Sequence, residues 1–257
     1  MFSRLFNRKK QEETDNKDLL VNTDANFSFL GADMHSHFIP GIDDGAKTID
    51  DSLNLIQSMV ALGYKTIITT PHIMIDYYPN TSQIIHQGLE VVQEALREKK
   101  IDVTIKAAAE YYIDEHFIRL LETEPLLTIY KNEVLVECSM LYEPPMLTEV
   151  LFNIISSGYR PILAHPERYL FFHNKTDKYQ ELKDRGCLLQ LNMLSLTGYY
   201  GKNIKMIADD LLTKKMYDYV GTDTHHEKHV DAIKNMINTK AYNVLTSYSF
   251  LNSKLYL

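Results

Sequence analysis

The stretch Asp33-Met34-His35-Ser36-His37 closes the first apolar run of the chain and carries two histidines two positions apart. In a strand this spacing points both imidazoles to the same side. Two neutral imidazoles that converge beside a carboxylate are the ligands that a borderline divalent metal ion requires. Histidines at this spacing also occur in exposed loops. The pair alone leaves both explanations open, and the rest of the chain decides between them.

Short apolar runs alternate with longer helix-like segments from Phe29 onward, which is the pattern of βαβ units around a parallel sheet. A helix is predicted to begin after Thr48, with acidic residues in its first turn, and to end near Gly63. Further helices are predicted over 84–96 and 149–157. The seven runs predicted as strands are Phe29–Met34, Thr66–Thr70, Val103–Ala108, Val134–Val136, Ile162–Ala164, Leu188–Leu191 and Tyr219–Gly221. The sequence therefore predicts an α/β fold with parallel strands.

Metal-ligand types or other strongly polar residues follow these runs. They are His35 and His37, His72, Glu110, Glu137, His165, Asn192, and then Asp223 with His225. In a parallel barrel the carboxyl ends of the strands open on one face, where such folds place their chemistry. Each additional buried polar group costs free energy unless it is paired, so a purely structural explanation of the whole set is poor. We therefore expect these side chains to form one site.

Single members of the set keep a second explanation. Glu137 also fits a salt-bridged carboxylate of the core, and Asn192 fits a hydrogen bond to a neighbouring loop better than metal ligation. Turn formation alone explains the residue types of the loop 41–45, but its position after the first histidine pair makes Asp43 and Asp44 ligand candidates. The histidines predicted to lie at the surface, in a helix or in a loop, without a ligand role, are His86, His173, His226 and His229.

Composition and charge exclude several classes of function. The 257 residues are 45% apolar with a net charge of −7, and the predicted domain has no basic stripe for a phosphate backbone. Nucleic acid is therefore not an expected partner. Cys138 and Cys187 give no disulfide framework, which fits a reducing cytoplasm. No apolar stretch is long enough to span a membrane, so no integral membrane association is expected.

The first 28 residues are predicted to be a mobile polar and basic leader, and residues 29–257 a single domain. Four cations in the first ten positions, Arg4, Arg8, Lys9 and Lys10, precede a polar run. With the apolar residues beside them, these cations fit a short amphipathic turn on the inner face of a membrane. Solvated disorder is the other explanation.

Several segments resemble the polymerase and histidinol phosphatase (PHP) superfamily. They are Asp33-Met34-His35-Ser36-His37 with the Asp43-Asp44-Gly45 loop, Thr70-Pro71-His72, Ala109-Glu110-Tyr111-Tyr112, Ala164-His165-Pro166-Glu167-Arg168 and Thr222-Asp223-Thr224-His225. The Asp-Asp-Gly loop and the His-Pro-Glu-Arg segment are most similar to the bacterial manganese-dependent protein tyrosine phosphatases of capsule and exopolysaccharide regulation. The resemblance extends from about Asp33 to the carboxyl terminus.

This resemblance implies a distorted seven-stranded (β/α)7 PHP barrel, with the active site at the carboxyl ends of the strands. It also implies three divalent ions, which would be manganese, with iron or zinc as alternatives. The implied ligands are His35, His37 and Asp223 for one ion, Glu137 and His165 for a second that shares Glu110 with the first, and Asp44, His72 and His225 for the third.

The resemblance assigns phosphate binding to Arg168, whose planar guanidinium fits two phosphate oxygens. It also gives His165 and His225 catalytic roles besides metal binding. In these phosphatases a second phosphate-binding arginine follows the last ligand pair. This chain has His226-Glu227-Lys228-His229 there, so Lys228 or His229 is the candidate substitute.

The implied reaction is hydrolysis of phosphotyrosine by in-line attack of a hydroxide that bridges two metal ions. A phenol with a pKa of about 10 leaves more easily than an alcohol. Tyr111, Tyr112 and Tyr142 either form an aromatic rim for the substrate or pack within the fold. The implied partner is a phosphotyrosine-bearing protein, namely a membrane-associated bacterial tyrosine kinase.

Other phosphatase and hydrolase mechanisms lack their residues. Cysteine-dependent phosphatases need an arginine six positions after the nucleophile, where this chain has Pro144 and Met193. The chain also has no P-loop and no Gly-x-Ser-x-Gly elbow. Three alternatives to a tyrosine phosphatase remain. They are a small-molecule phosphatase of the histidinol-phosphate type, a nuclease or proofreading module, which the acidic charge disfavours, and a non-enzymatic metal-binding regulator.

Overall fold

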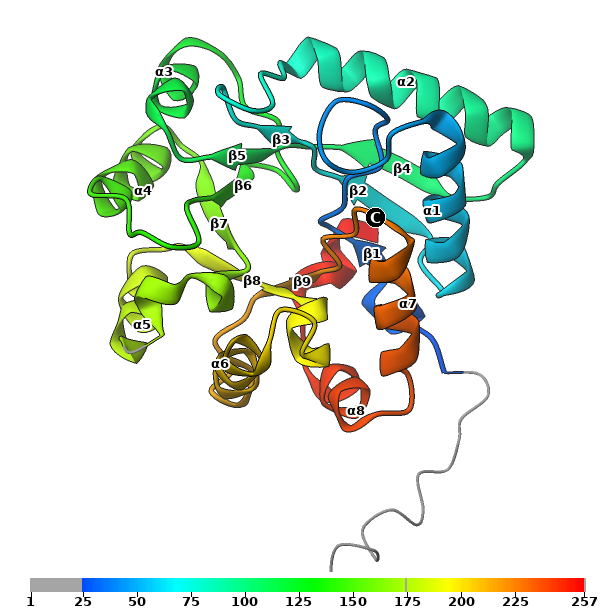
Figure 1. Cartoon of the computed structure of the whole chain (residues 1–257). Coiled ribbons are helices and arrows are strands. Elements are labelled where there is room, and N and C mark those ends of the chain that lie inside the picture. The colour runs from blue at the N-terminus through cyan, green and yellow to red at the C-terminus, as the bar shows by residue number, and fades with distance from the viewer. Residues whose placement is uncertain (1–24, 174, 257) are drawn as a thin grey trace, which may run out of the picture.

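The computed structural model describes residues 25–173 and 175–256. Figure 1 shows the strands gathered at the centre and the helices arranged around them on the outside. Helices that cover a parallel sheet bury its apolar side chains, and this is the architecture that alternating runs predict. The prediction of an α/β fold with parallel strands is confirmed.

The strands of the described residues form two sheets, and every ladder between them is parallel. One sheet has the order β1-β2-β4 and the other the order β3-β5-β6-β7-β8-β9. The strands are β1 (Ala32–Asp33), β2 (Thr66–Thr69), β3 (His72–Ile73), β4 (Thr104–Ala107), β5 (Glu110–Tyr112), β6 (Glu133–Glu137), β7 (Arg160–Ala164), β8 (Leu188–Asn192) and β9 (Tyr219–Gly221). Because parallel strands end at the same edge, the residues that follow them are brought together.

Two predicted strands are each followed by a short strand that the sequence analysis did not predict. The run 66–70 gives β2, which ends before Pro71, and β3 resumes at His72 in the other sheet. Proline has no N–H to donate to a ladder. The run 103–108 gives β4, and β5 follows at Glu110 after two alanines. The described residues thus form nine strands in two sheets, of which β3 and β5 lie outside the seven predicted runs, and no closed barrel ladder is formed among them.

The first predicted strand is shorter than expected. Ser28–Leu30 forms the 3-10 helix η1, and only Ala32–Asp33 is a strand. Gly31 separates the two with a φ of +77°, a value that residues with a side chain rarely adopt. The expectation of a strand from Phe29 is therefore wrong, because the chain turns at this glycine before it enters the sheet.

A seam separates β1 from β9, which do not pair as a ladder. The segments that follow them meet in a single parallel bridge between Ser36 and Thr224. Beside this bridge the amide of Asp223 donates to the carbonyl of His35 at 2.7 Å. The seam is thus tied at the end where the predicted ligands lie.

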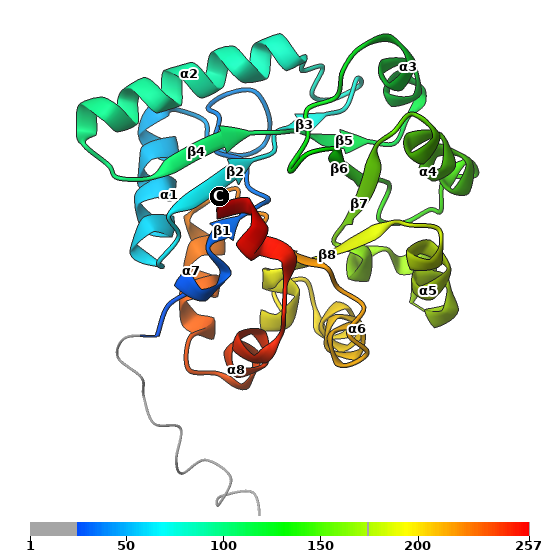
Figure 2. The same cartoon turned by 180° about the vertical axis from the view of Figure 1, so that it is seen from behind.

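Asn252 ties the same seam between the strands themselves. It belongs to the 3-10 helix η5 (Leu251–Tyr256), and Figure 2 shows this C-terminal segment beside β1. Its side-chain amide donates to the carbonyls of Ala32 (3.0 Å) and Val220 (2.7 Å), and its oxygen accepts from the amide of Val220 at 3.0 Å. One side chain therefore replaces part of the missing ladder.

We expect Asn252→Ala to lower the free energy of unfolding by about 2–3 kcal/mol, because it leaves buried backbone groups of both strands without partners. The side chain is 1% exposed, so water does not reach these groups in the folded protein. Urea unfolding followed by circular dichroism measures the change. Asn243→Ala, at an exposed position of α8, is the matched control. Equal changes in the two variants would contradict the bridging role of Asn252.

The α-helices of the described residues are α1 (Ile49–Ala61), α2 (Ser82–Lys99), α3 (Glu115–Thr123), α4 (Leu147–Ser156), α5 (Thr176–Asp184), α6 (Lys202–Thr213), α7 (Glu227–Met236) and α8 (Lys240–Ser247). The predicted start after Thr48 is confirmed. The Thr48 hydroxyl accepts from the amide of Asp51 at 3.1 Å, and the Asp51 carboxylate accepts from the amide of Thr48 at 3.0 Å. This reciprocal pair is a capping box. The helices predicted over 84–96 and 149–157 are α2 and α4.

The packed part of the chain begins earlier than predicted. Phe27 belongs to the predicted leader, yet it is fully buried, and its ring stacks on Tyr64 with the ring centres 6.2 Å apart. The rest of that leader, residues 1–24, lies outside the described residues. Within the described part, the helices are too short or too polar to cross a membrane.

Candidate metal centre

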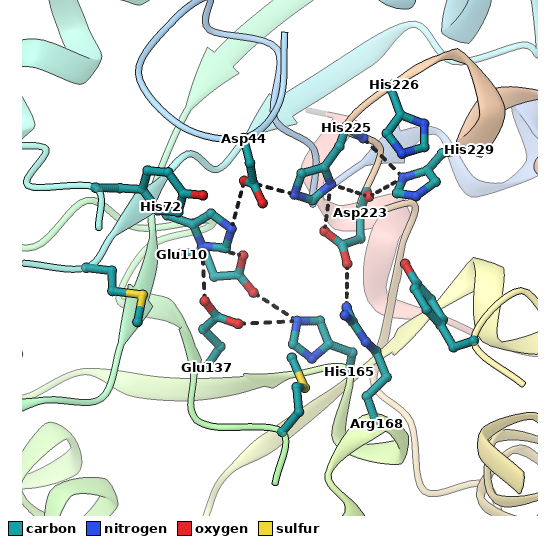
Figure 3. A pocket seen from close by; sticks show the side chains of 14 residues that line it. Asp44, His72, Glu110, Glu137, His165, Arg168, Asp223, His225, His226 and His229 are labelled. Atoms are coloured by element: carbon teal, nitrogen blue, oxygen red, sulfur yellow. Dashed lines mark hydrogen bonds and ion pairs between the residues drawn. The ribbon is translucent and has the colours of Figure 1, made fainter. Parts of the chain in front are cut away.

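The nine predicted metal ligands all lie at one site. Figure 3 shows many of them arranged around a common space, with side chains that point toward one another. His35 and His37 follow β1, Asp44 comes from the loop before α1, His72 begins β3, Glu110 begins β5, Glu137 ends β6, His165 follows β7, and Asp223 and His225 follow β9. The strand ends of both sheets therefore contribute to a single centre.

Glu110 lies in the middle of this centre and is fully buried. Its Oε2 atom is 3.0 Å from Nε2 of His35, 3.5 Å from Nε2 of His37 and 3.3 Å from Nδ1 of His72. Its Oε1 atom is 3.0 Å from Nε2 of His165. The two carboxylate oxygens thus serve different imidazoles, which is an arrangement suited to a ligand shared between two ions.

Asp223 completes the inner part of the centre. Its Oδ1 atom is 3.3 Å from Nε2 of His35 and 3.4 Å from Nε2 of His37. Both Asp223 and His165 have a positive φ, of +52° and +35° respectively. Residues other than glycine in this region are strained and gather at functional sites. The backbone at these two strand ends therefore carries strain at positions that aim side chains into the site.

The outer part of the centre is built around Asp44 and Glu137. Oδ1 of Asp44 lies 3.4 Å from Nε2 of His72 and 3.4 Å from Nε2 of His225. Glu137 has one oxygen 3.0 Å from Nδ1 of His72 and the other 3.8 Å from Nε2 of His165. Asp44 is the most exposed member of the set, with a side chain 51% exposed. The centre thus opens to solvent on the Asp44 side.

Charge distribution in the centre follows from burial and from these contacts. Burial by itself would raise the pKa of Glu110, but the imidazoles of His35 and His72 outweigh it and hold that pKa well below its ordinary value. The pKa of Asp223 is likewise held low by His35 and His225, against the effect of burial. Both carboxylates therefore stay ionised at neutral pH, and a bound cation would neutralise their charge.

The residues fit a divalent metal ion. Four buried ligand atoms have no hydrogen-bond partner among the described residues, namely Nε2 of His35, Nε2 of His37, Nδ1 of His72 and Oε2 of Glu110. Buried polar atoms are normally paired. Because the three nitrogens surround one oxygen at 3.0–3.5 Å, they converge on a common point. Imidazole and carboxylate without thiolate suit manganese, iron or zinc.

Arg168 lies beside the centre in the 3-10 helix η2 (Pro166–Arg168). Its Nη1 atom donates to Oδ2 of Asp223 at 2.9 Å, and its guanidinium lies 4.3 Å from the ring centre of Tyr200. The other oxygen of Asp223 faces the imidazoles, so the guanidinium touches the ligand set without belonging to it. Guanidinium has five N–H donors. The donors not used by Asp223 can hold an anion at the centre.

The sequence profile of the capsular polysaccharide synthesis CpsB/CapC family matches residues 31–244. The chain belongs to this family. Tyrosine-protein phosphatase YwqE of Bacillus subtilis (strain 168) is 26% identical over 197 residues, which cover 76% of this chain and 78% of the relative. Tyrosine-protein phosphatase CpsB of Streptococcus pneumoniae is 28% identical over 200 residues, which cover 76% of this chain and 82% of the relative.

Solved structures share the fold of this CpsB/CapC-family chain. A crystal structure from work on YwqE of B. subtilis and CpsB of S. pneumoniae, described as unique metal-dependent tyrosine phosphatases, superposes with a TM-score of 0.75 at 24% identity. The match covers 88% of this chain and 94% of that one. An amidohydrolase from Mycoplasma synoviae superposes with a TM-score of 0.50 at 14% identity, over 90% of this chain and 88% of that one. The family assignment and the fold therefore agree.

Asp43, a ligand candidate in the sequence, contacts Nδ1 of His37, whereas Glu110 lies near Nε2 of the same ring. One oxygen of Asp43 is 2.8 Å from Nδ1 of His37 and accepts from the amide of His72 at 3.2 Å. The other accepts from the amide of Gly45 at 3.0 Å. A carboxylate on the far nitrogen of a ligating histidine fixes its tautomer and its orientation. Asp43 thus orients the candidate ligand His37 and is not itself one of the candidate ligands.

We expect Asp43→Ala to weaken manganese binding roughly 10- to 100-fold, as the loss of such supporting partners does in metal sites. The physical reason is that His37 loses the group that holds its ring in place. Titration of metal-stripped protein with manganese, followed by calorimetry, measures the affinity. Asp50→Ala, at an exposed position of α1, is the control and should bind as the unaltered chain does. Unchanged affinity in Asp43→Ala would show that the ring is positioned by other contacts.

Gln190 is a supporting residue that the sequence analysis missed. Its Oε1 atom lies 3.0 Å from Nδ1 of His35 and accepts from the amide of His165 at 3.3 Å. Gly221 leaves the room for this arrangement, because a Cβ atom there would lie 2.6 Å from the Cβ of His35 and 2.9 Å from Nε2 of Gln190. A polar residue within the apolar run 188–191 is the signal that could have identified Gln190.

Glu167 and Asn192 hold the segment that carries Arg168. The fully buried Glu167 carboxylate accepts from the amide of Asn192 (3.0 Å), the hydroxyl of Ser195 (2.7 Å) and the hydroxyl of Tyr217 (3.1 Å). The predicted loop contact of Asn192 is confirmed, since its Nδ2 donates to the hydroxyl of Tyr200 in the loop before α6 at 3.3 Å. Asn192 also donates to Oδ2 of Asp223 at 2.8 Å, which the sequence did not indicate.

Of the two candidate substitutes for a second arginine, only His229 lines the cavity at this centre. It is 7% exposed, so the prediction of a surface histidine is wrong. Burial lowers its pKa to about 4, with His226 and His225 adding to the effect. The ring is therefore neutral at physiological pH. Lys228 is exposed, and His229 supplies hydrogen bonding but no positive charge.

The other histidines and the three tyrosines that the sequence analysis singled out differ in exposure. His86 and His226 are exposed, as predicted, although His226 also lines the cavity, and His173 donates to the carbonyl of Glu167 at 2.8 Å. Tyr111 is a packing residue, since it is 1% exposed and its hydroxyl accepts from the amide of Leu127 at 2.8 Å. Tyr142 is 75% exposed, and Tyr112 is half-buried. None of these three tyrosines lines the cavity.

Proposed function

We propose that this chain is a metal-dependent protein tyrosine phosphatase. The observation that carries the proposal is the convergence of nine histidine, aspartate and glutamate side chains beside Arg168, at the strand ends of a CpsB/CapC-family fold. Relatives named tyrosine-protein phosphatase match more than three quarters of their own length to this chain. The site supplies both parts that phosphate ester hydrolysis needs, a cation-binding floor and a guanidinium for the phosphoryl oxygens.

We assign the ligands to three ions, for which manganese is our first choice. Groups of ligand atoms that lie within 4.8 Å of one another include His35, His37, Glu110 and Asp223, then His72, Glu110 and Glu137, and also His37, Asp44, His72 and His225. His165 joins the second group through its 3.0 Å contact with Glu110. When bound, such ions lower the pKa of a water molecule to near neutrality and polarise the phosphoryl oxygens.

We further propose that the two sheets act as one distorted seven-stranded PHP barrel. The bridge between Ser36 and Thr224 supports this, because it joins the first and the last strand ends. The division of two strands at Pro71 and after Ala107 accounts for the distortion. Such a barrel places every ligand on one face, so a substrate reaches all of them from one side.

The chain's own residues orient the substrate and exclude a competing mechanism. Arg168 is held by Asp223 and Tyr200 before substrate binds. Its free N–H groups therefore bind phosphoryl oxygens without a further loss of side-chain conformational freedom. Burial raises the pKa of the Cys138 thiol and of the Cys187 thiol to about 12. Neither thiol is therefore a nucleophile at neutral pH.

We propose a phosphotyrosine-bearing protein as the substrate, and within that class a bacterial tyrosine kinase of capsule synthesis. The family's role in capsular polysaccharide synthesis supports this choice. A substrate of this kind, a phosphorylated kinase tail at the inner face of the membrane, would place the enzyme in the cytoplasm. The two unpaired cysteines are compatible with such a reducing compartment.

The test compares three substrates with metal-stripped protein before and after manganese is added. They are a phosphotyrosine peptide, the same peptide with phosphoserine, and histidinol phosphate. We expect manganese-dependent turnover that prefers phosphotyrosine and is lost in His35→Ala. His86→Ala, at an exposed position of α2, is the matched control. Turnover of histidinol phosphate alone would replace the substrate class, and no turnover of any substrate would favour the metal-binding regulator.

A further inference from the structure

Two kinds of side chain line the cavity at the metal centre, the candidate metal ligands with Arg168, here called the floor, and a group of large side chains without charge. The cavity volume is about 370 Å³, which suits one small group and not a large cofactor. The floor consists of the ligand side chains and Arg168. Apart from these groups and from His226 and His229, the side chains that line the cavity are Met74, Tyr78, Met140 and Tyr200. These four residues belong to no ligand group, and they come from three separate loops.

The two tyrosines among these four residues contact side chains of the floor. Tyr200 lies against the guanidinium of Arg168, with 4.3 Å between ring centre and guanidinium carbon. The ring of Tyr78 stacks on His72, with the ring centres 5.4 Å apart and the planes at 16°. Each tyrosine therefore already has one ring face covered. The two methionines are the remaining apolar side chains of the cavity lining.

Met74 is held in a rigid position. Its amide donates to the carbonyl of Tyr78 at 3.0 Å, and the amide of Tyr78 donates back to the carbonyl of Met74 at 2.7 Å. This reciprocal pair closes a tight loop directly after β3. The loop begins two residues after the candidate ligand His72, so the backbone from which the Met74 side chain extends is fixed beside the metal centre.

Met140 is held on another side of the same cavity. It follows the ligand Glu137 by three residues, and its carbonyl accepts from the amide of Leu170 at 2.9 Å. That bond ties the loop after β6 to the segment that follows Arg168. The side chain is half-buried and packs against the core. Two thioethers from different loops thus face one cavity whose floor binds phosphate.

We propose that Met74 and Met140 form the subsite for the aromatic ring of the substrate and set the preference for aryl over alkyl phosphates. The proposal rests on the proposed phosphatase function. When the floor holds the phosphoryl group, the group esterified to it lies against the rest of the cavity lining. Thioether sulfur is polarisable and makes favourable contacts with aromatic rings. A phosphoserine side chain has no group that could fill this space.

The test measures binding, so it does not depend on turnover. Benzylphosphonate and methylphosphonate share the anion and differ by the ring, and neither carries an ester to hydrolyse. Their Kd values are measured by calorimetry with the manganese-loaded full chain and with Met74→Ala, Met140→Ala and the double variant. Met206→Ala, at a 59% exposed position of α6 outside the cavity lining, is the control.

We expect benzylphosphonate to bind more tightly than methylphosphonate to the unaltered chain. Each single variant should weaken benzylphosphonate roughly 2- to 10-fold and leave methylphosphonate unchanged, with a larger loss in the double variant. Parallel loss of both ligands, or no loss of either, would overturn the proposal, as would equal affinity of the two ligands for the unaltered chain. A different result would contradict the phosphatase function alone, namely tighter binding of benzylphosphonate than of methylphosphonate without hydrolysis of the phosphotyrosine peptide.

Discussion

Glu110→Gln is expected to reduce manganese-dependent phosphotyrosine hydrolysis roughly 10²- to 10³-fold, the effect of removing one preorganised charge from an active site. The Glu110 carboxylate contacts His35, His72 and His165 at 3.0–3.3 Å through its two oxygens. An amide of the same size is neutral, and its NH2 group cannot accept. In the variant, at least one of the two carboxylate oxygen positions is therefore occupied by an NH2 group, which cannot bind a cation.

The measurement combines hydrolysis of a phosphotyrosine peptide with the number of manganese ions bound per chain. Both should fall in Glu110→Gln, because Glu110 is the ligand that we propose two ions share. Glu133→Gln is the matched control, since Glu133 is also a buried glutamate but begins β6 and bonds to the hydroxyl of Tyr219, away from the ligand set. If Glu110→Gln kept full metal content and activity, Glu110 would not be a ligand.

The position of the site was predictable because it depends on strand ends and not on strand boundaries. Parallel strands deliver the residues that follow them to one edge. His35 and Glu137 reach the centre although β1 is shorter and β6 is longer than the predicted runs. The prediction therefore tolerated errors of several residues in the elements themselves.

The division of the sheet could not be read from the apolar pattern. The run 103–108 is continuous in the sequence, yet the ladder breaks after Ala107 and resumes at Glu110 in the second sheet. Hydrophobicity reports burial and not ladder pairing, and only Ile105 and Ala108 of this run are buried. Pro71 was the one local signal of such a break, because proline cannot donate to a sheet.

The supporting contacts of the site were missed because their partners are far apart in the sequence. Gln190 and His35 are 155 positions apart in the sequence, and Asn252 bridges the first strand, β1, and the last strand, β9. A single sequence shows that these residues are polar within apolar surroundings, but not which groups they face. His229 was misjudged for a related reason, since a histidine in a charged stretch is usually exposed and here the helix α7 turns it into the cavity.

Arg168→Ala is expected to lower kcat/KM for a phosphotyrosine peptide roughly 10²- to 10³-fold, while Arg168→Lys recovers only part of the loss. Lysine restores a positive charge but offers no planar fork for two phosphoryl oxygens, and its ammonium cannot hold Asp223 and the substrate in the same plane. The stack on Tyr200, with 4.3 Å from guanidinium to ring centre, is lost as well.

Manganese content decides how the Arg168 result is interpreted. Because Arg168 bonds to Oδ2 of Asp223 at 2.9 Å, its loss could act through that ligand and not through the substrate. We expect metal content to stay unchanged and the inhibition constant of inorganic phosphate to rise together with KM, since the guanidinium binds the anion. Arg185→Ala, which removes an exposed arginine that follows α5 and pairs with Glu181, should change neither value. A loss of metal that matches the loss of activity would make Arg168 a positioning residue for Asp223 and would remove it from phosphate binding.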